Sequence, residues 1–350
     1  MFGNQTMTWQ YICNNKTFIN KLDVLKESKT SKQKIDFIVP SAYDTYDFTI
    51  NPTKSLEELC KQKALDIREK NDKVVIWYSG GCDSHYVLDV FLKNNIHIDE
   101  IHMVKSGFKN ADYEIDKYAW PFVKKLDIKT VIHEPTLEYY EKSYVGKQKQ
   151  LGTANDYWHH FRLNNDFENL QNYTTNKVAH IFGKEKPTLI FKDGKWYLYF
   201  LDVDVTPQPN QINFFSDDPA IHSKQCHMLI NQIQMTKNQN DYNHVTWYNS
   251  DQDFWNKSIG RYNNSTFPLK QMKENIYNNK DEQAIKQAPV YLVTAWQEKN
   301  KRLVEQFGED SFNKGDPALG TIGVFSKFYC ISERSTKTVD ELFPDGFKIQ

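Results

Sequence analysis

The part of the chain that most constrains its fold is residues 74–88, which read Val-Val-Ile-Trp-Tyr-Ser-Gly-Gly-Cys-Asp-Ser-His-Tyr-Val-Leu. The first five residues are β-branched or aromatic, as a buried parallel strand requires. A short polar turn with two adjacent glycines comes next at 79–84, and apolar residues at helical spacing begin at Val87. A strand, a tight loop and a helix in this order direct several backbone N–H groups to the positive end of the helix. This pattern predicts a binding site for a phosphate or pyrophosphate group.

A plainer explanation of the same loop is a strand-to-helix turn in which Asp83 and Ser84 cap the helix. Capping accounts for one hydroxyl and one carboxylate, but it does not require two adjacent glycines. We therefore interpret residues 79–84 as a phosphate-binding loop, a hypothesis that a strand before the loop and a helix after it would support.

Strands and helices alternate around this loop. A capping box at Ser55 and Glu58 opens a helix that ends just before the strand. The alternation indicates βαβ units, and hence an α/β fold with a parallel twisted sheet and helices on both faces. Sites in such sheets lie at the carboxyl ends of the strands, where the loop also lies. The expected helices are 55–70 and 112–126, the latter interrupted near Pro121, and the expected later strands are 98–104, 128–133 and 177–182.

Two further local patterns lie outside the segment of alternating strands and helices. Asp193-Gly194 lies between apolar runs within residues 188–201 and predicts a hairpin with a type I′ turn. From Thr206 onward, prolines and asparagines mark a break between lobes. We expect an N-terminal cover segment over residues 1–70, an α/β domain over 71–205 and a mostly helical C-terminal lobe over 206–350.

Composition restricts the class of protein. Mean hydropathy is −0.71, and no apolar run approaches the roughly 20 residues of a transmembrane helix, so we expect a cytoplasmic protein without membrane contact. The net charge of −1 does not support nucleic-acid binding, although a local basic groove is compatible with it. Five scattered cysteines without a Cys-x-x-Cys pair fit a reducing compartment. The abundance of Asn, Lys, Tyr and Phe suggests an AT-rich genome, such as that of a bacteriophage.

The loop also carries a resemblance to a known family. Its six residues match the Ser-Gly-Gly-x-Asp-Ser signature of the PP-loop family, the N-type ATP pyrophosphatases, which have an adenine nucleotide alpha hydrolase-like (HUP) fold. Asparagine, GMP and NAD synthetases carry this signature, and the synthetase domain of asparagine synthetase is nearest in type. The resemblance covers about residues 73 to 205. The matching residues are Ser79, Gly80, Gly81, Cys82, Asp83 and Ser84.

The resemblance implies an AMP-forming ligase that uses ATP and Mg²⁺. A carboxyl, carbonyl or amide oxygen of the substrate would attack the α-phosphorus, pyrophosphate would leave, and a nitrogen nucleophile would displace AMP. The protein would mainly position groups and stabilise charge. The loop residues would hold the pyrophosphate, with Cys82 at the variable position, and Asp83 would coordinate Mg²⁺. Val104, with Lys105 and Ser106, would line the adenosine.

A second loop comes after the strand expected at 177–182. Family members place a glycine-containing loop there, and in the asparagine synthetase group it reads Gly-x-Gly followed by acidic residues. This chain keeps Gly183 and Glu185 but lacks the second glycine and the paired acid. Lys184 or Lys186 could neutralise phosphate charge, with Lys186 and Glu185 in catalytic roles, and Glu185 could help to hold Mg²⁺. An ordinary charged turn at the end of a strand explains the same residues equally well.

Departures from the family leave three hypotheses open. The first is the asparagine synthetase-like ligase, acting on a small-molecule or nucleoside acceptor. Because residue 2 is Phe and not the nucleophilic Cys of a glutamine-fed enzyme, its ammonia would be free or come from a partner. The second is a PAPS reductase-like or sulfur-transfer enzyme, which would need a reactive Cys226 or Cys330. The third is a nucleotide-binding module without catalytic activity.

Overall fold

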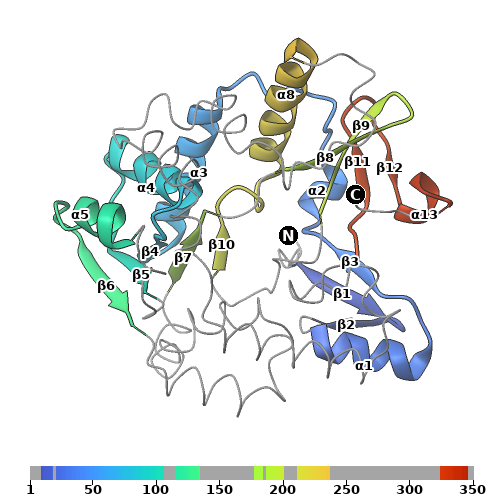
Figure 1. Ribbon diagram of the computed structural model, residues 1–350, viewed down its shortest axis with the longest axis horizontal. Helices are drawn as coiled ribbons and strands as arrows, with labels where there is room; N and C mark the ends of the chain where they lie inside the picture. Colours follow the sequence, from blue (N-terminus) through green and yellow to red (C-terminus); the bar gives the residue numbers. More distant parts are fainter. Residues whose placement is uncertain are drawn as a thin grey trace, which may run out of the picture.

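The computed structural model describes residues 9–18, 21–105, 115–134, 177–183, 187–200, 211–236 and 324–345. Its central sheet has the strand order β10-β7-β4-β5-β6 (Figure 1). Every neighbouring pair in this sheet is parallel, which confirms the α/β fold. The strands are β4 (Lys73–Trp77), β5 (Glu100–Val104), β6 (Lys129–His133), β7 (Val178–Phe182) and β10 (Gln211–Asn213). The helices of this part are α3 (Leu56–Lys70), α4 (Cys82–Lys93), η1 (Ile115–Ala119), α5 (Trp120–Val123) and α8 (Pro219–Thr236).

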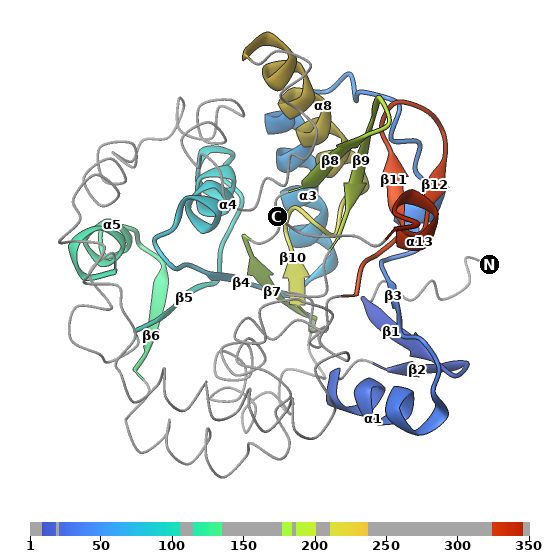
Figure 2. The same cartoon turned by 45° about the vertical axis from the view of Figure 1, so that its right-hand side comes forward.

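The two faces of the central sheet bury different sets of side chains. On one face Val74 and Ile76 of β4 join the main hydrophobic core, which also contains Phe91 of α4. Helices α3 and α4 pack together over this face (Figure 2). On the opposite face Trp77 belongs to a separate cluster with Val75, Val178 and Phe182, against which Val104 packs. The alternation along β4 therefore assigns successive side chains to two cores.

The predicted helices around the sheet form with local adjustments. Helix α3 begins at the expected capping box, in which the Ser55 side chain accepts from the Glu58 backbone N–H at 3.1 Å and the Ser55 N–H donates to the Glu58 carboxylate at 2.7 Å. Of the helix expected at 112–126, the part from residue 115 is a π-helical turn, η1, followed by the short α5 with a proline in its first turn, and residues 112–114 lie outside the described residues. Proline has no N–H to donate, so the interruption lies where the sequence predicts it.

The predicted hairpin is present as β8 (Thr188–Lys192) and β9 (Lys195–Tyr199). Asp193 and Gly194 have φ values of 51° and 78°, as both central residues of a type I′ turn require. The hairpin belongs to a second, antiparallel sheet in the order β12-β11-β9-β8, and not to the central one. Its other strands are β11 (Phe328–Cys330) and β12 (Thr336–Lys337), and the short helix α13 (Val339–Leu342) comes after them.

The N-terminal residues pack against this second sheet and α8. Trp9 and Tyr43 meet Phe200 edge-on, with ring centroids 4.9 and 5.1 Å apart, and the Trp9 indole N–H donates to the Asp217 carboxylate at 3.1 Å. Figure 2 shows the N-terminal sheet, in the order β2-β1-β3, on the same side of the molecule as β11 and β12. The elements are β1 (Gln10–Cys13), β2 (Lys16–Phe18), α1 (Lys21–Ser31), β3 (Asp36–Ile38) and α2 (Ala42–Thr45).

The C-terminal part, from residue 206, contributes strands as well as helices. Helix α8 forms at residues 219–236. However, β10 pairs with β7 and β11 pairs with β9, so strand pairing crosses the boundary expected at residue 206. These strands are only three residues long, too short to give a periodic signal. Residues 237–323 of the expected lobe lie outside the described residues. Within the described part, no helix has the length and apolar character to cross a membrane.

Candidate functional site

The loop at residues 79–84 connects the carboxyl end of β4 to the first turn of α4, as the sequence predicts. Gly80 has φ of 81°, in the left-handed region that favours glycine. Gly81 is the N-cap residue of α4, and a Cβ there would lie 3.3 Å from the Ser79 hydroxyl. The two glycines therefore have separate roles, one in backbone conformation and one in close packing. The N–H groups of the first turn of α4 face this end of the sheet.

Hydrogen bonds within the loop fix its shape. The Ser84 hydroxyl accepts from the Ser79 N–H at 3.2 Å and donates to the Gly81 carbonyl at 3.0 Å. The Ser79 hydroxyl lies 3.1 Å from that of Ser84 and accepts from the Gly81 N–H at 3.3 Å. Ser84 thus joins the two ends of the loop, which a simple helix cap does not do. The N-cap residue of α4 is Gly81, and no side chain caps the helix, so Asp83 and Ser84 are not its N-caps.

Two buried residues that flank the loop were missed from the sequence. The Tyr78 hydroxyl lies 3.0 Å from His85 Nδ1, so the residue before the loop is bonded to the residue after it. Burial, with a smaller contribution from Lys93, lowers the pKa of His85 to about 4, and the imidazole is therefore neutral near pH 7. The only signal of this contact in the sequence is that Tyr78 and His85 lie immediately before and after the motif.

Gly183 lies directly against the loop. It comes after β7, whose last residue, Phe182, is in register with Trp77 at the end of β4. A Cβ at Gly183 would lie 2.6 Å from the backbone of Asp83 and Ser84. The end of β7 therefore reaches the start of α4 with no room for a side chain. Two parts of the chain predicted to share a site, 79–84 and Gly183, are in contact.

Gly183→Ala is expected to lower the free energy of unfolding by roughly 1–3 kcal/mol, because the added methyl group forces the backbone at Asp83 to move. ATP binding should weaken with it. Urea unfolding and titration calorimetry with ATP measure the two effects. The control is Gly194→Ala, at a turn with open space but φ of +78°, which should cost stability without affecting ATP binding. Unchanged ATP affinity in Gly183→Ala would contradict a role for Gly183 at the site.

The remaining predicted site residues lie at the end of β5, at the start of α4 or outside the described part of the chain. Val104 ends β5, next to β4, and packs on the cluster that contains Trp77. Lys105 comes directly after it and forms an ion pair with Asp116 at 2.6 Å. Cys82 is the first residue of α4 and Asp83 lies in its first turn. The residues outside the described part are Ser106, Lys184, Glu185 and Lys186.

The described part of the chain was predicted to contain a magnesium ligand, Asp83, and two cysteines of interest, Cys226 and Cys330. No group of three or more His, Cys, Asp or Glu side chains among the described residues is arranged to hold a metal ion. A Mg²⁺ site does not require such a group, because Mg²⁺ commonly takes one or two carboxylates together with substrate phosphates. Cys226 and Cys330, like Cys13 and Cys60, are buried and unoxidised, and burial raises the pKa of the Cys226 thiol.

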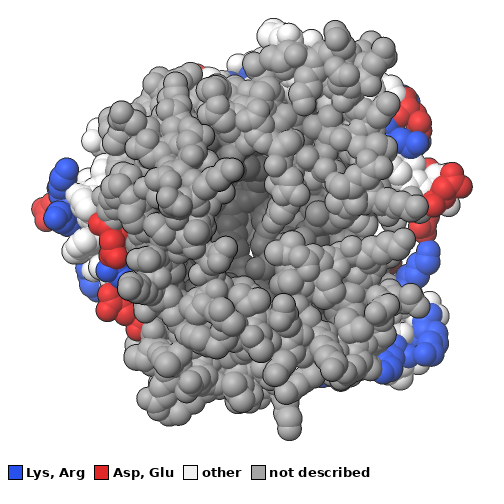
Figure 3. All heavy atoms as spheres, viewed as in Figure 1, with Lys and Arg blue, Asp and Glu red and all other residues white. Residues whose placement is uncertain are grey.

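Among the described residues visible in Figure 3, neither the basic nor the acidic side chains form a patch of a single charge. In Figure 3 their basic and acidic side chains lie close together at both edges of the face. Lys34 and Asp340 form an ion pair, with charged groups 2.7 Å apart. A continuous basic surface for a nucleic-acid backbone is therefore not seen in the described part of this face.

Comparisons with known proteins add little to this geometry. No protein-family model matches the chain, and no curated protein matches it. Among solved structures, the chain is similar to the NH3-dependent NAD synthetase from Campylobacter jejuni subsp. jejuni NCTC 11168 in complex with the nitrate ion. The match has 11% sequence identity and a TM-score of 0.29, and it covers 73% of this chain and 97% of that chain. A likeness at this level carries no argument about function, and no comparison supports a bacteriophage origin.

Proposed function

We propose that this protein is an ATP-dependent adenylating enzyme, an AMP-forming ligase of the PP-loop type. The observation that carries the proposal is the complete Ser-Gly-Gly-x-Asp-Ser motif on a strand–loop–helix unit, with Gly183 in contact with the loop backbone. The loop is closed by its own hydrogen bonds, so its shape is set before a ligand binds. ATP would bind at the carboxyl edge of the central sheet.

Each residue of the loop has a role in this proposal. The backbone N–H groups of Gly80 and Cys82 would bind the pyrophosphate portion of ATP. The Gly81 N–H and the Ser79 hydroxyl, which bond to each other in the loop, would exchange that bond for contacts with the phosphates. The Ser84 hydroxyl mainly holds the loop closed, since it bonds to Ser79 and Gly81. Asp83 holds Mg²⁺, which neutralises phosphate charge when bound. Val104 lines the adenosine.

In this proposal, the charged residues after Gly183 neutralise the phosphates and help to hold Mg²⁺. Lys184 and Lys186 would stabilise the departing pyrophosphate, and Glu185 would be the second carboxylate near Mg²⁺. A substrate oxygen attacks the α-phosphorus and pyrophosphate leaves. A nitrogen nucleophile then attacks the adenylated carbon and AMP leaves. The acceptor is a small molecule or a nucleoside, activated at a carboxyl, carbonyl or amide oxygen as in asparagine synthetase.

The burial of the cysteine thiols argues against the sulfur-transfer alternative. A nucleophilic thiol needs a lowered pKa and access to solvent. Cys226 is fully buried with a raised pKa, and Cys330 is 2% exposed. The four described buried cysteines fit instead a reducing compartment such as the cytoplasm. A nucleotide-binding module without catalysis is the alternative that the experiment must separate.

The test is incubation of the full chain with Mg²⁺ and α-labelled ATP against a panel of amino acids, nucleosides, tRNA and DNA, with ammonium as nitrogen source. We expect AMP and pyrophosphate in equal amounts with one class of acceptor. Saturable ATP binding without AMP formation would favour the inactive module. Absence of ATP binding would contradict the proposal as a whole.

A further inference from the structure

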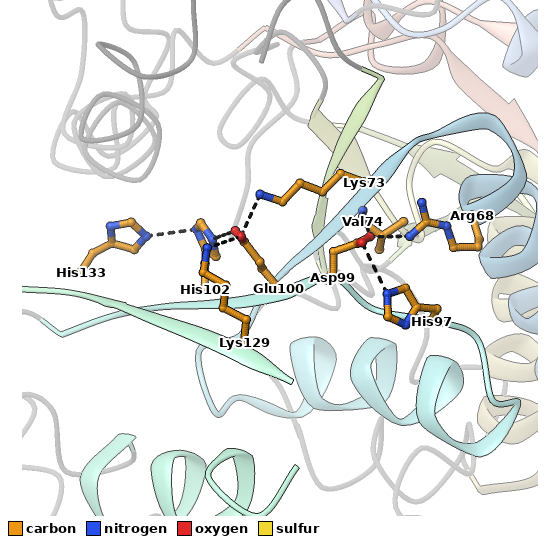
Figure 4. Close-up of polar contacts among 9 residues, drawn as sticks. All are labelled: Arg68, Lys73, Val74, His97, Asp99, Glu100, His102, Lys129 and His133. Carbon is orange, nitrogen blue, oxygen red and sulfur yellow. Dashed lines mark hydrogen bonds and ion pairs between the residues drawn. The ribbon is translucent and has the colours of Figure 1, made fainter. Parts of the chain in front are cut away.

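The face of the central sheet opposite α3 and α4 contains a chain of polar side chains. Both faces of a parallel sheet are usually apolar, but here Glu100 is 5% exposed and His102 is 2% exposed. Figure 4 shows these two side chains and His133 in a row, with Lys73 and Lys129 at the Glu100 end. The row runs along β5 and β6 from their amino ends towards their carboxyl ends.

Glu100 is held as a carboxylate. Its Oε1 atom lies 2.8 Å from Lys73 Nζ and 2.6 Å from Lys129 Nζ, and its Oε2 atom lies 2.9 Å from His102 Nε2. Burial acts to raise the pKa of Glu100, but these three hydrogen bonds outweigh it and lower the pKa to about 2. Near pH 7 Glu100 therefore only accepts hydrogen bonds, and His102 Nε2 must carry a proton.

The protonation of His102 then determines that of His133. His133 Nε2 lies 3.1 Å from His102 Nδ1, and the two nitrogens share one hydrogen bond. In the tautomer with both rings neutral and His102 protonated at Nε2, His102 Nδ1 accepts this bond and His133 Nε2 donates it. In that tautomer, the proton-accepting nitrogen of His133 is Nδ1. The row of polar side chains thus connects the Glu100 carboxylate, near the amino end of β5, with the His133 imidazole at the carboxyl end of β6.

His133 lies at the same edge of the sheet as the loop. It is the last residue of β6, and its ring stacks on Trp77 with centroids 5.3 Å apart and 18° between the planes. Trp77 is two residues before Ser79 and stacks on Phe182 as well, the residue before Gly183. The Trp77 indole N–H donates to His180 at 3.1 Å, so its ring is held in place.

We propose that Glu100, His102 and His133 form a proton relay that serves the nitrogen nucleophile, an inference that rests on the proposed function. A nitrogen entering as ammonium loses a proton to His133 Nδ1, and its lone pair attacks the adenylated carbon. The new C–N bond forms, the bond from that carbon to the AMP oxygen breaks, and AMP leaves with the electron pair. The second proton of the attacking nitrogen passes to the phosphate of the departing AMP. The Nε2 proton of His133 passes to His102, whose positive charge Glu100 stabilises. His133 is the catalytic residue, and the other two are positioning residues.

The first test measures the protonation of the two histidine rings and needs no catalytic reaction. Nitrogen-15 histidine labelling of the full chain, with long-range proton–nitrogen spectra, shows which ring nitrogen carries the proton. We expect Nε2–H on both His102 and His133 at neutral pH. A His133 ring protonated only at Nδ1 overturns the relay and leaves the proposed ATP chemistry intact.

The second test compares two nucleophiles with the acceptor from the ATP experiment. Hydroxylamine is largely unprotonated at neutral pH, whereas ammonia is mostly ammonium and needs a base. For His133→Gln we expect a fall in kcat of roughly 10²-fold or more with ammonium salts and a much smaller fall with hydroxylamine. His97→Gln is the control, because the His97 side chain is 75% exposed and lies outside the chain of polar side chains.

The outcomes separate the two proposals. Equal loss with both nucleophiles indicates a structural effect and overturns the relay, as does full activity of His133→Gln with ammonium. AMP formation by the wild-type protein in either case keeps the proposed function. Failure of the wild-type protein to form AMP with every acceptor overturns both proposals.

Discussion

Replacing Asp83 with Ala is expected to reduce ATP-dependent AMP formation by roughly 10²- to 10³-fold or more. Asp83 is the only carboxylate of the loop, and it lies in the first turn of α4, next to the N–H groups proposed to bind pyrophosphate. Without it the cation that neutralises the phosphates loses a ligand. The measurement is the initial rate of labelled AMP release at saturating ATP and acceptor.

The fold should survive this change, since the Asp83 side chain is only partly buried. Far-ultraviolet circular dichroism and the urea midpoint test this point. Asp23→Ala is the matched control, because Asp23 is also an acid in the first turn of a helix and its side chain is 58% exposed. Full activity in Asp83→Ala would remove the basis for assigning the loop to ATP.

Local patterns explain how much of the site could be predicted from the sequence. The strand before Ser79, the glycine turn and the helix after it all depend on residues within about one helical turn of each other. The same holds for the capping box of α3 and the type I′ turn at Asp193 and Gly194. Gly183 was predicted from the resemblance, since PP-loop proteins place a glycine-containing loop after this strand, and the parallel register brings it to the loop at 79–84.

The polar chain on the opposite face could not be predicted, because it depends on register between strands. Glu100 meets Lys129 only because these residues are paired between β5 and β6. A shift of one residue would turn a side chain to the other face. In the sequence, the charges at the starts of β4 and β6 resemble ordinary strand ends, and His102 resembles a core residue. Tyr78 and His85 were missed for a similar reason, since their contact crosses the loop.

Acid is expected to destabilise the protein partly through Glu100. The pKa of this carboxyl is lowered from 4.5 to about 2 by Lys129, Lys73 and His102, against the opposing effect of burial. A lowered pKa in the folded state stabilises the fold above the unfolded pKa, and this contribution is lost as the pH falls from about 4.5 to 2. The shift corresponds to roughly 3 kcal/mol of unfolding free energy, since one pKa unit is about 1.4 kcal/mol.

Glu100→Gln isolates this contribution. The amide keeps the shape of the side chain but cannot carry the charge that pairs with the two lysines, so the variant should be less stable at pH 7 by roughly 3 kcal/mol. The difference from wild type should narrow as the pH falls towards 2, because the protonated carboxyl and the amide are both neutral. Urea unfolding at a series of pH values measures it. Glu69→Gln, at an exposed position on α3, is the control and should follow the wild-type curve. A constant gap between Glu100→Gln and wild type down to pH 2 would mean that the lost stability comes from packing and not from the carboxylate charge.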